Sequence, residues 1–286
     1  MIRVVIVNYG AGKLLADAVA SVAGLAEAGH EVRVVDNASP DGSLEGLEHR
    51  FPWLDILRLE ENVGFGAACN RGAQGATGRA VLFLNPDAAV EADTAGRLEA
   101  ALADRPRLGA VAPALRYPDG RRQFSWEPTP GIVGETLRKL RNPFEATAWA
   151  QALLPRLARL WGDPGWLSGA CLCVRREAFE AIGGFDESFF LYFEDADLCL
   201  RLRAAGWKVA VVPDAHAIHD KGRGGTSSAS EVPYRRAQFL FYRRHRSERS
   251  SRLLLRRLRR KFARIEDGDR RARLLGLCDE AERALG

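Results

Sequence analysis

Residues 80–87 read AVLFLNPD, five apolar residues that stop at Asn85, Pro86 and Asp87. A short, uninterrupted apolar run is typical of a strand buried on both faces of a sheet. An acid directly after such a strand needs solvent or a charged partner, and a divalent cation that also binds phosphate oxygens is one such partner. A turn that caps the following helix explains Asp87 equally well. The stretch therefore predicts a buried strand and leaves two interpretations of the acid.

Strand-like and helix-like segments alternate on both sides of this stretch. Strands are expected at 4–7, 31–35, 55–59, 80–84, 109–115, 166–174 and 208–212. Helices are expected at 13–28, 43–50, 64–75, 93–103, 175–182 and 193–205. The alternation predicts an α/β fold, a Rossmann-like and mostly parallel sheet with helices on both faces. Six prolines break the pattern within 117–165, which we interpret as an excursion on the acceptor side of a substrate cleft.

The bulk composition is that of a soluble globular chain. Its 286 residues are 47% hydrophobic and 28% charged, which suits one large α/β domain with an appended segment. Five cysteines without a repeating frame predict reduced packing thiols in a cytoplasmic protein. Neither a secretory signal nor an apolar run long enough to span a bilayer is evident, so we do not expect the chain to cross one.

Charge is concentrated at the C-terminal end. Residues 233–286 hold 17 Lys and Arg against 7 Asp and Glu, whereas the whole chain has a net charge of only +5. We therefore divide the chain into a domain at 1–232 and a basic amphipathic helical segment at 233–286. Within it, residues 252–262 mix leucines with cations. Three interpretations are open: contact with an anionic membrane surface, which we favour, packing on the domain with a solvated basic face, and nucleic-acid binding, which we rank last.

Further polar groups gather where the expected strands end. Asp36 follows the second strand, where an acid can bind a nucleoside and where a simple turn is the alternative. Residues 61–72 pack small residues at a helix start, which permits close approach of a ligand to the backbone. His219 follows the last strand and is a candidate metal ligand, although a lone histidine is usually structural.

Three acids crowd the start of one helix, at Glu194, Asp195 and Asp197. They cannot all be helix caps, and like charges this close together raise one another's pKa. A carboxylate whose pKa approaches neutrality is a candidate general base. An acidic first turn that satisfies the helix dipole is the alternative.

Taken together, these segments resemble glycosyltransferase family 2, in particular its rhamnosyltransferase-like branch. The resemblance covers about residues 2–230 and keeps the family's order of motifs. The matching segments are Ile6-Val7-Asn8-Tyr9, Val35-Asp36-Asn37-Ala38-Ser39, Asn62-Val63-Gly64-Phe65-Gly66 with Asn70, Asn85-Pro86-Asp87, Ser168-Gly169-Ala170, Gly183-Gly184-Phe185-Asp186-Glu187, and Phe193-Glu194-Asp195-Ala196-Asp197-Leu198 with Arg201.

The resemblance implies a GT-A fold, inversion at the anomeric carbon and a nucleotide diphosphate sugar as donor. It implies Asp195 as the catalytic base and Asp87 with His219 as ligands of Mg²⁺ or Mn²⁺. Asn85 replaces the first acid of the family's Asp-x-Asp motif, so it is expected to contact the donor instead of the metal. The donor-binding residues that it implies are Val7, Tyr9, Asp36, Asn62, Gly64, Phe65, Asn70, Asn85 and Asp87.

Acceptor and positioning roles are expected for a second group of residues. Trp126 and Trp166 are candidates for stacking on sugar faces, with a core or lid role as the alternative. Glu194, Asp197 and Arg201 either position Asp195 or form structural pairs.

The resemblance suggests dTDP-rhamnose as the donor, with UDP-sugars behind it, and a glycan or lipid-linked saccharide acceptor in cell-surface polysaccharide synthesis. The protein is then expected in the cytoplasm or on the inner face of the cell membrane. Two alternatives remain at this stage, a nucleotidyltransferase that makes nucleotide sugars and a non-catalytic protein that binds sugars or recruits partners to a membrane.

Overall fold

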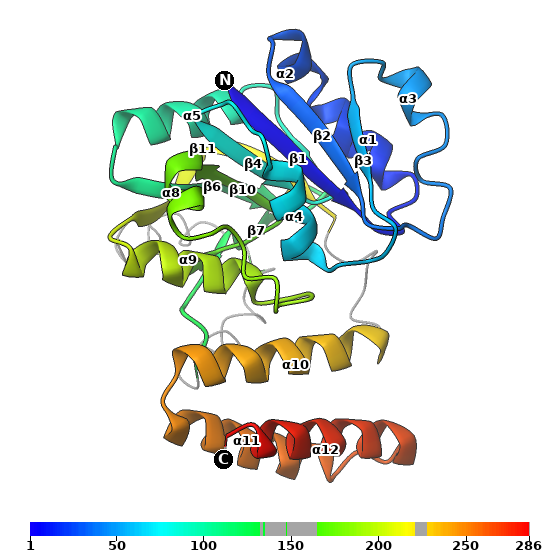
Figure 1. The fold of residues 1–286 in the computed structure, drawn as a ribbon, viewed down its shortest axis with the longest axis vertical. Coiled ribbons are helices and arrows are strands. Elements are labelled where there is room, and N and C mark those ends of the chain that lie inside the picture. The colour runs from blue at the N-terminus through cyan, green and yellow to red at the C-terminus, as the bar shows by residue number, and fades with distance from the viewer. Residues whose placement is uncertain (132–133, 135–146, 148–164, 221–227, 286) are drawn as a thin grey trace.

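The structure is a computed structural model and describes residues 1–131, 134, 147, 165–220 and 228–285. Nine strands of this described part form one sheet in the order β3-β2-β1-β4-β10-β6-β11-β5, with β7 paired to β6 (Figure 1). The strands are β1 (Ile2–Asn8), β2 (Glu31–Asp36), β3 (Asp55–Arg58), β4 (Ala80–Leu84), β5 (Ala88–Val90), β6 (Leu108–Arg116), β7 (Arg122–Gln123), β10 (Cys171–Arg175) and β11 (Lys208–His219).

The sheet is mixed, with a parallel N-terminal half. Strands β3, β2, β1 and β4 are parallel neighbours, and β6 and β11 are parallel as well. Strand β10 lies between β4 and β6 and is antiparallel to both. Two further short strands, β8 (Trp126–Glu127) and β9 (Trp166–Leu167), pair with each other as a separate antiparallel ribbon. The expected α/β architecture is confirmed, and the carboxyl ends of β1, β2 and β4 share one edge of the sheet.

Helices cover both faces of the sheet because β1 is buried on both sides. Val4 and Ile6 pack into one core, whereas Val5 and Val7 pack into the other. The first core is covered by α1 (Leu14–Ser21), α2 (Ala23–Glu27), α3 (Leu47–Arg50) and α5 (Thr94–Asp104). The second is covered by α4 (Phe65–Ala73), α8 (Arg176–Ala181) and α9 (Glu194–Ala204). All five cysteines are buried free thiols, as expected for packing residues.

A layer of three helices lies beside this domain, next to α9 (Figure 1). They are α10 (Ser228–His245), α11 (Glu248–Phe262) and α12 (Gly268–Arg283). The side chains of Ser247 and Asp267 cap the starts of α11 and α12 by accepting backbone hydrogen bonds. A third apolar cluster joins the helices to one another and reaches Phe189 and Ala196 of the domain.

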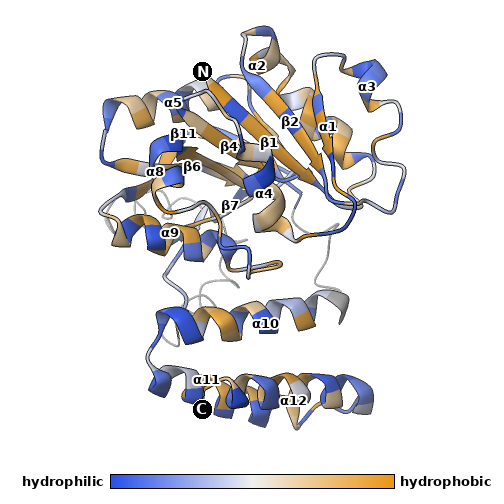
Figure 2. Cartoon of the chain, in the orientation of Figure 1, coloured by the Kyte–Doolittle hydropathy of each residue, from blue (hydrophilic) through white to orange (hydrophobic). Residues whose placement is uncertain are grey.

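The leucines of α11 face inward, which changes how its sequence is understood. Leu254, Leu255 and Leu258 are at most 5% exposed, and Leu253 alone among the leucines of this helix is open, at 52%. Figure 2 shows how hydrophilic positions, coloured blue, alternate with hydrophobic positions, coloured orange, along these helices. The structure therefore matches the alternative of a packed helix with a solvated basic face. Insertion of the α11 leucines into a membrane, the interpretation that we favoured, would first require this core to open.

The length and hydropathy of the helices bear on whether the chain crosses a bilayer. Within the described residues, no helix is both long enough and apolar enough to cross a bilayer.

Several element boundaries differ from those expected. The helix expected at 13–28 is two helices, because Ser21 Oγ donates to Ala18 O and the backbone turns at Val22. The last strand continues past Val212 to His219, with a bulge that accommodates Pro213. Helix α10 begins at Ser228, so it crosses the expected boundary between 232 and 233. Residues 132–133, 135–146 and 148–164 of the expected excursion lie outside the described residues.

Candidate active site

The ends of β1 and β2 are joined by side-chain hydrogen bonds. Asn8, fully buried at the end of β1, donates through Nδ2 to Asp36 Oδ1 at 2.9 Å and to Ser43 Oγ at 2.8 Å. Tyr9 follows directly and is 54% exposed. The side chain of Val7 is buried in the core, so only its backbone is available to a ligand. This edge thus offers a fixed carboxylate and an open aromatic ring side by side.

A second loop is fastened to this edge by Asn37. Its Nδ2 donates to Asn62 Oδ1 at 2.9 Å, and Asn62 Oδ1 also accepts from the backbone N–H of Gly64 at 3.0 Å. Gly64 has a φ of +89°, and a Cβ there would lie 2.6 Å from Phe190 O. Glycine is therefore required at this point. The tight turn starts α4 and brings Phe65 to the cleft described below.

Asn70 holds a loop and does not line this cleft. Its Nδ2 donates to Phe185 O at 2.9 Å, and its Oδ1 accepts from Phe185 N at 2.8 Å. Gly184 lies so close that a Cβ there would be 2.5 Å from Asn70 Oδ1. Both ends of the Asn70 amide thus bind the backbone of Phe185, which gives Asn70 a structural role in this loop.

An acid and a histidine meet where β4 and β11 end. His219 is the last residue of β11, and its Nε2 lies 3.5 Å from Asp87 Oδ1. Its Nδ1 lies 2.7 Å from Gln123 Oε1. Because a carbonyl oxygen only accepts, Nδ1 carries a proton, and Nε2 is the ring nitrogen that faces Asp87. Asn85 stands at the same strand end, where its backbone N–H donates to Ala170 O.

This pair fits a divalent cation. Asp87 Oδ1 is buried and has no hydrogen-bond partner among the described residues, which is the condition of a metal ligand without its metal. The described residues contain no cluster of three His, Cys, Asp or Glu side chains that converge as ligands. A cation held here would therefore take most of its oxygen ligands from phosphate groups and water, as Mg²⁺ typically does.

The start of α9 presents Glu194 and Asp195 under backbone strain. Tyr192 and Phe193, directly before them, have φ values of +72° and +66°. Left-handed backbone at bulky residues is unfavourable by about 1–3 kcal/mol each and is found mainly at functional sites. The only other described non-glycine residue with positive φ is Ala38, beside Asp36. The strain is thus concentrated where the acids of the site are placed.

Both carboxyls of this pair have raised pKa values. Burial, followed by the charge of Asp195, raises the pKa of Glu194 to about 8. Burial raises the pKa of Asp195 to about 7, against hydrogen bonds from the N–H groups of Gly169 and Ala196, and Glu127 raises it further. Gly169 N donates to Asp195 Oδ2 at 2.9 Å and so orients the carboxylate. Asp195 is half-buried and borders the cleft, which gives it the pKa and the access of a general base.

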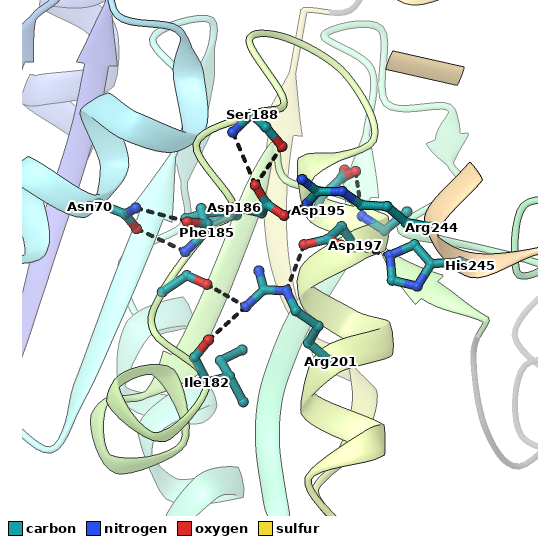
Figure 3. A network of polar contacts seen from close by, with 12 residues as sticks. Asn70, Ile182, Phe185, Asp186, Ser188, Asp195, Asp197, Arg201, Arg244 and His245 are labelled. Atoms are coloured by element: carbon teal, nitrogen blue, oxygen red, sulfur yellow. Dashed lines mark hydrogen bonds and ion pairs between the residues drawn. The ribbon is translucent and has the colours of Figure 1, made fainter. Parts of the chain in front are cut away.

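Asp197, two residues further on, has a different environment (Figure 3). It is 1% exposed, and its two oxygens accept from Arg201 Nε and His245 Nε2, each at 2.7 Å. Arg201 also donates to the carbonyls of Ile182 and Gly184. Arg244, next to His245, forms an ion pair with Asp186. Asp197 and Arg201 therefore form a structural network that links α9, the 182–186 loop and α10.

One cleft collects many of the residues singled out from the sequence. It has a volume of about 1040 Å³ and passes from the sheet edge to the C-terminal helices. The expected site residues that line it are Phe65, Asn85, Trp166, Glu194, Asp195 and His219. Trp126 is 8% exposed and packs in the core. The cleft thus brings the candidate base and the histidine of the candidate metal pair to one space.

Comparison with known proteins gives this cleft a chemical context. The chain matches Glycosyl transferase family 2 over residues 3–183 and Glycosyl transferase family group 2 over residues 140–259. The chain belongs to glycosyltransferase family 2. The match to a family of transferases decides for a glycosyltransferase over the nucleotidyltransferase and the non-catalytic alternatives.

Relatives of this glycosyltransferase place it in the rhamnosyltransferase-like branch. It is 35% identical to an N-acetylglucosaminyl-diphospho-decaprenol L-rhamnosyltransferase of Mycobacterium tuberculosis, over 81% of this chain and 80% of the relative. A 54-residue stretch, 19% of this chain and 20% of the relative, is 48% identical to a rhamnosyltransferase of Escherichia coli.

The fold is GT-A, as the resemblance implied. A mannosyltransferase from Pyrobaculum calidifontis, solved with GDP-Man and Mn²⁺, superposes with a TM-score of 0.61 at 19% identity. The superposition covers 99% of this chain and 74% of that one.

Sequence reasoning missed two side chains and one backbone group of the site. Gln123, which fixes the tautomer of His219, and Glu127, which raises the pKa of Asp195, lie in the proline-broken stretch where no periodicity marks an element. The N–H of Gly169 holds Asp195. The motif Ser168-Gly169-Ala170 marks this segment in the sequence, but the residue types alone do not show that a backbone N–H is the group that binds Asp195.

Proposed function

We propose that this enzyme transfers a deoxyhexose, with L-rhamnose from dTDP-rhamnose as the first choice, to a lipid-linked saccharide with inversion at the anomeric carbon. One observation carries the proposal: Asp195 and His219, whose Nε2 faces Asp87, line the same cleft. A proton acceptor and the residues that would hold a diphosphate-bound cation thus belong to one cleft, as an inverting transfer requires.

Asp195 serves as the general base in this scheme. Its carboxylate takes the proton of an acceptor hydroxyl as that oxygen forms a bond to the anomeric carbon. The bond from this carbon to the diphosphate breaks, and the diphosphate leaves with the bonding electrons. A base with a pKa of about 7 is matched to this task at neutral pH, since it is ionised yet still basic. The N–H groups of Gly169 and Ala196 hold the carboxylate in place during the transfer.

Asp87 and His219 hold the leaving-group side of the site. When bound there, Mg²⁺ or Mn²⁺ neutralises the charge that develops on the diphosphate. Gln123 keeps His219 in the tautomer whose Nε2 can be a ligand. Asn85, the residue of the Asn-Pro-Asp motif that lines the cleft, contacts the donor sugar or its phosphate.

The nucleoside is assigned to the edge formed by β1 and β2. The carboxylate of Asp36, fixed by Asn8, accepts hydrogen bonds from the base or the ribose, and the exposed ring of Tyr9 stacks on the base. Asn62 and Gly64 keep the neighbouring loop close to the donor. Trp166, which lines the cleft, offers its ring to the acceptor sugar.

The choice of sugar and acceptor follows from the relative of Mycobacterium tuberculosis, whose name states an L-rhamnosyl transfer to a lipid-linked N-acetylglucosaminyl diphosphate. The alignment with that relative covers four-fifths of both chains, which supports a similar reaction for this enzyme. An acceptor anchored in a lipid would bring the enzyme to the cytoplasmic face of a membrane as a peripheral protein.

The test is a donor panel. Hydrolysis and transfer are measured with dTDP-rhamnose, other dTDP-sugars and UDP-sugars, each with Mg²⁺, with Mn²⁺ and with EDTA. We expect one donor to be used in a metal-dependent way and Asp87→Ala to abolish that use. Asp214→Ala, which removes an exposed acid of β11, serves as the matched control and should behave as wild type. Binding of no nucleotide sugar under any condition would refute the proposal.

A further inference from the structure

The cleft extends beyond the transfer site and ends among cations. Arg235 of α10, Arg257 and Lys261 of α11, and Arg270 of α12 all line its wall. Lys261 is affected by all three arginines: burial lowers its pKa first, and Arg235, Arg270 and Arg257 each lower it further. We call these four residues the cation cluster. Three separate helices thus direct positive charge into one end of the cleft.

The cation cluster is only partly neutralised by the protein. Glu231 pairs with Arg270 at 2.8 Å and is the acid that acts on Lys261. Arg235 is held at 2.7 Å to Gln238 Oε1, with its guanidinium over the Phe262 ring. Within the described residues, neither Arg257 nor Lys261 forms an ion pair. Four cations are therefore balanced by two nearby carboxylates, Glu231 and Asp267.

Such a concentration of cations at one end of a cleft attracts anions, although Arg257, Lys261 and Arg270 are themselves exposed to solvent. The pKa of Lys261 is lowered first by burial and then by these like charges. The core of α10–α12 does not require these charges at the cleft, because its packing rests on leucines and aromatic rings such as Leu254 and Phe241. The cations are pre-arranged for a ligand with at least two negative charges, and arginine forks match phosphate oxygens well.

The position of the cation cluster distinguishes it from the donor side. The candidate metal pair lies where β4 and β11 end, whereas the cation cluster lies on the C-terminal helices, and Asp195 borders the same cleft. A ligand in this part of the cleft lies on the side of the C-terminal helices, in the same cleft that Asp195 borders. The part-exposed side chains of Leu191 and Tyr234 line the cleft as well, so that the wall suits an amphiphile.

We propose that Arg235, Arg257, Lys261 and Arg270 bind the diphosphate that links the acceptor sugar to its lipid. The assignment rests on the proposed function, since it gives the acceptor of that reaction its binding subsite. It also gives the basic C-terminal segment a task that needs no exposed apolar face. Recognition of the diphosphate sets the distance of the acceptor sugar from Asp195 and excludes neutral glycosides of the same sugar.

The test compares two acceptors of N-acetylglucosamine, one linked to farnesol through a diphosphate and one linked as a neutral farnesyl glycoside. The variant is the double substitution Arg257→Gln and Lys261→Gln. The control is Arg256→Gln with Arg260→Gln, which removes the same charge from exposed positions of the same helix outside the cleft. We expect the KM for the diphosphate acceptor to rise at least about tenfold in the test variant alone. The KM for the neutral acceptor should change equally little in both variants.

The other outcomes each overturn the assignment. An equal rise in KM for both acceptors would show that the substitutions disturb the cleft as a whole and not the binding of the diphosphate. A rise in the KM of the nucleotide sugar would assign the cation cluster to the donor. If the cation cluster binds vesicles that contain phosphatidylglycerol but does not bind the soluble diphosphate acceptor, its ligand would be lipid headgroups.

Direct binding separates this inference from the proposed function. Calorimetric titration of the diphosphate acceptor without donor should give weaker binding in the test variant than in the control. If wild type transfers no sugar but shows this cation-dependent binding, the proposed function fails and the subsite stands. If the two variants bind equally, the subsite is refuted whatever the transfer assay gives.

Discussion

The first turn of α9 carries acids that face two regions, the cleft and the C-terminal helices. On the cleft side, Asp195 receives backbone hydrogen bonds, forms no ion pair with a described residue, and has a pKa raised to about 7. On the helix side, Asp197 is almost fully buried and paired with both Arg201 and His245. The comparison indicates that a partner cation, and not burial alone, distinguishes the paired Asp197 from the carboxylate that we propose as the base.

The two environments also determine what each acid can do. Pairing engages both oxygens of Asp197 and makes it a joint between the domain and α10, with the side chain buried away from the cleft. The lack of such a pair leaves Asp195 basic and open, with Glu194 buried beside it and one Glu194 oxygen without a hydrogen-bond partner in the described structure. Substitution of Asp195 should therefore lower the activity, whereas substitution of Asp197 should lower the free energy of unfolding.

The largest effect is expected from Asp195→Asn. Removing the base should lower kcat by about 10³-fold, within the range of general-base contributions. Binding of the nucleotide sugar, measured by calorimetry, should persist. Stability should persist as well: the folded-state pKa of about 7 lies above the ordinary value of 3.8, so ionisation of Asp195 lowers stability as pH rises between the two. Asp214→Asn is the exposed control. Retained activity would remove Asp195 from the mechanism.

The opposite pattern is expected from Asp197→Ala. It leaves Arg201 and His245 without their shared carboxylate, and breaking a buried pair lowers the free energy of unfolding by about 3 kcal/mol. Urea unfolding measures this loss, and kcat of the folded fraction should stay within about twofold because the base is untouched.

Asp186→Ala is the control for this substitution. Its pairing with Arg244 is more exposed, so its loss should be about 1 kcal/mol or less. A fall in kcat without a fall in stability would contradict the structural role of Asp197.

A third substitution tests the candidate metal pair, where the partner of His219 is the neutral side chain of Gln123. Gln123→Leu removes the acceptor of His219 Nδ1–H and frees the ring to adopt its other tautomer. The Mn²⁺ concentration for half-maximal donor hydrolysis should rise about tenfold, at the lower end of effects from such supporting contacts. Paramagnetic resonance of Mn²⁺ with bound nucleotide gives the same affinity without turnover. Gln74→Leu, at an exposed position, is the control, and an unchanged affinity would refute the role of Gln123.

How much of this site was predictable depends on how local each signal is. The strand at 80–84 and the acid after it were visible because burial on both faces leaves a continuous apolar run. The order of motifs led to the family and the GT-A fold, both confirmed. The end of β11 was placed at Val212, since a proline normally ends a strand and a bulge leaves no mark in the sequence.

Long-range partners were not predictable. His245 lies 48 residues after Asp197, and no pattern links the two. The leucines of α11 have the same helical spacing whether they face a membrane or a neighbouring helix, and only tertiary packing decides between them. Gln123 lies in a two-residue strand too short for any periodicity.

The smallest expected effect is a shift in pH dependence that tunes Asp195 without touching it. Glu127 lines the cleft, and its charge raises the pKa of Asp195. Below its pKa, Asp195 is protonated and cannot accept a proton, so kcat should fall as pH falls through about 7. In Glu127→Gln the carboxylate form of Asp195 is favoured and its pKa falls. The acid limb of the profile should then move to lower pH by less than about one unit.

Asp186, in the 182–186 loop, supplies the control for this last measurement. Asp186→Asn removes a carboxylate whose charge is already neutralised by Arg244, so the pH profile should stay where it is. A limb that moves equally in both variants would mean that net charge, and not the field at Asp195, sets the profile. A limb that moves to higher pH in Glu127→Gln would contradict the assignment of the limb to Asp195, because removing a like charge cannot raise the pKa of a carboxyl group.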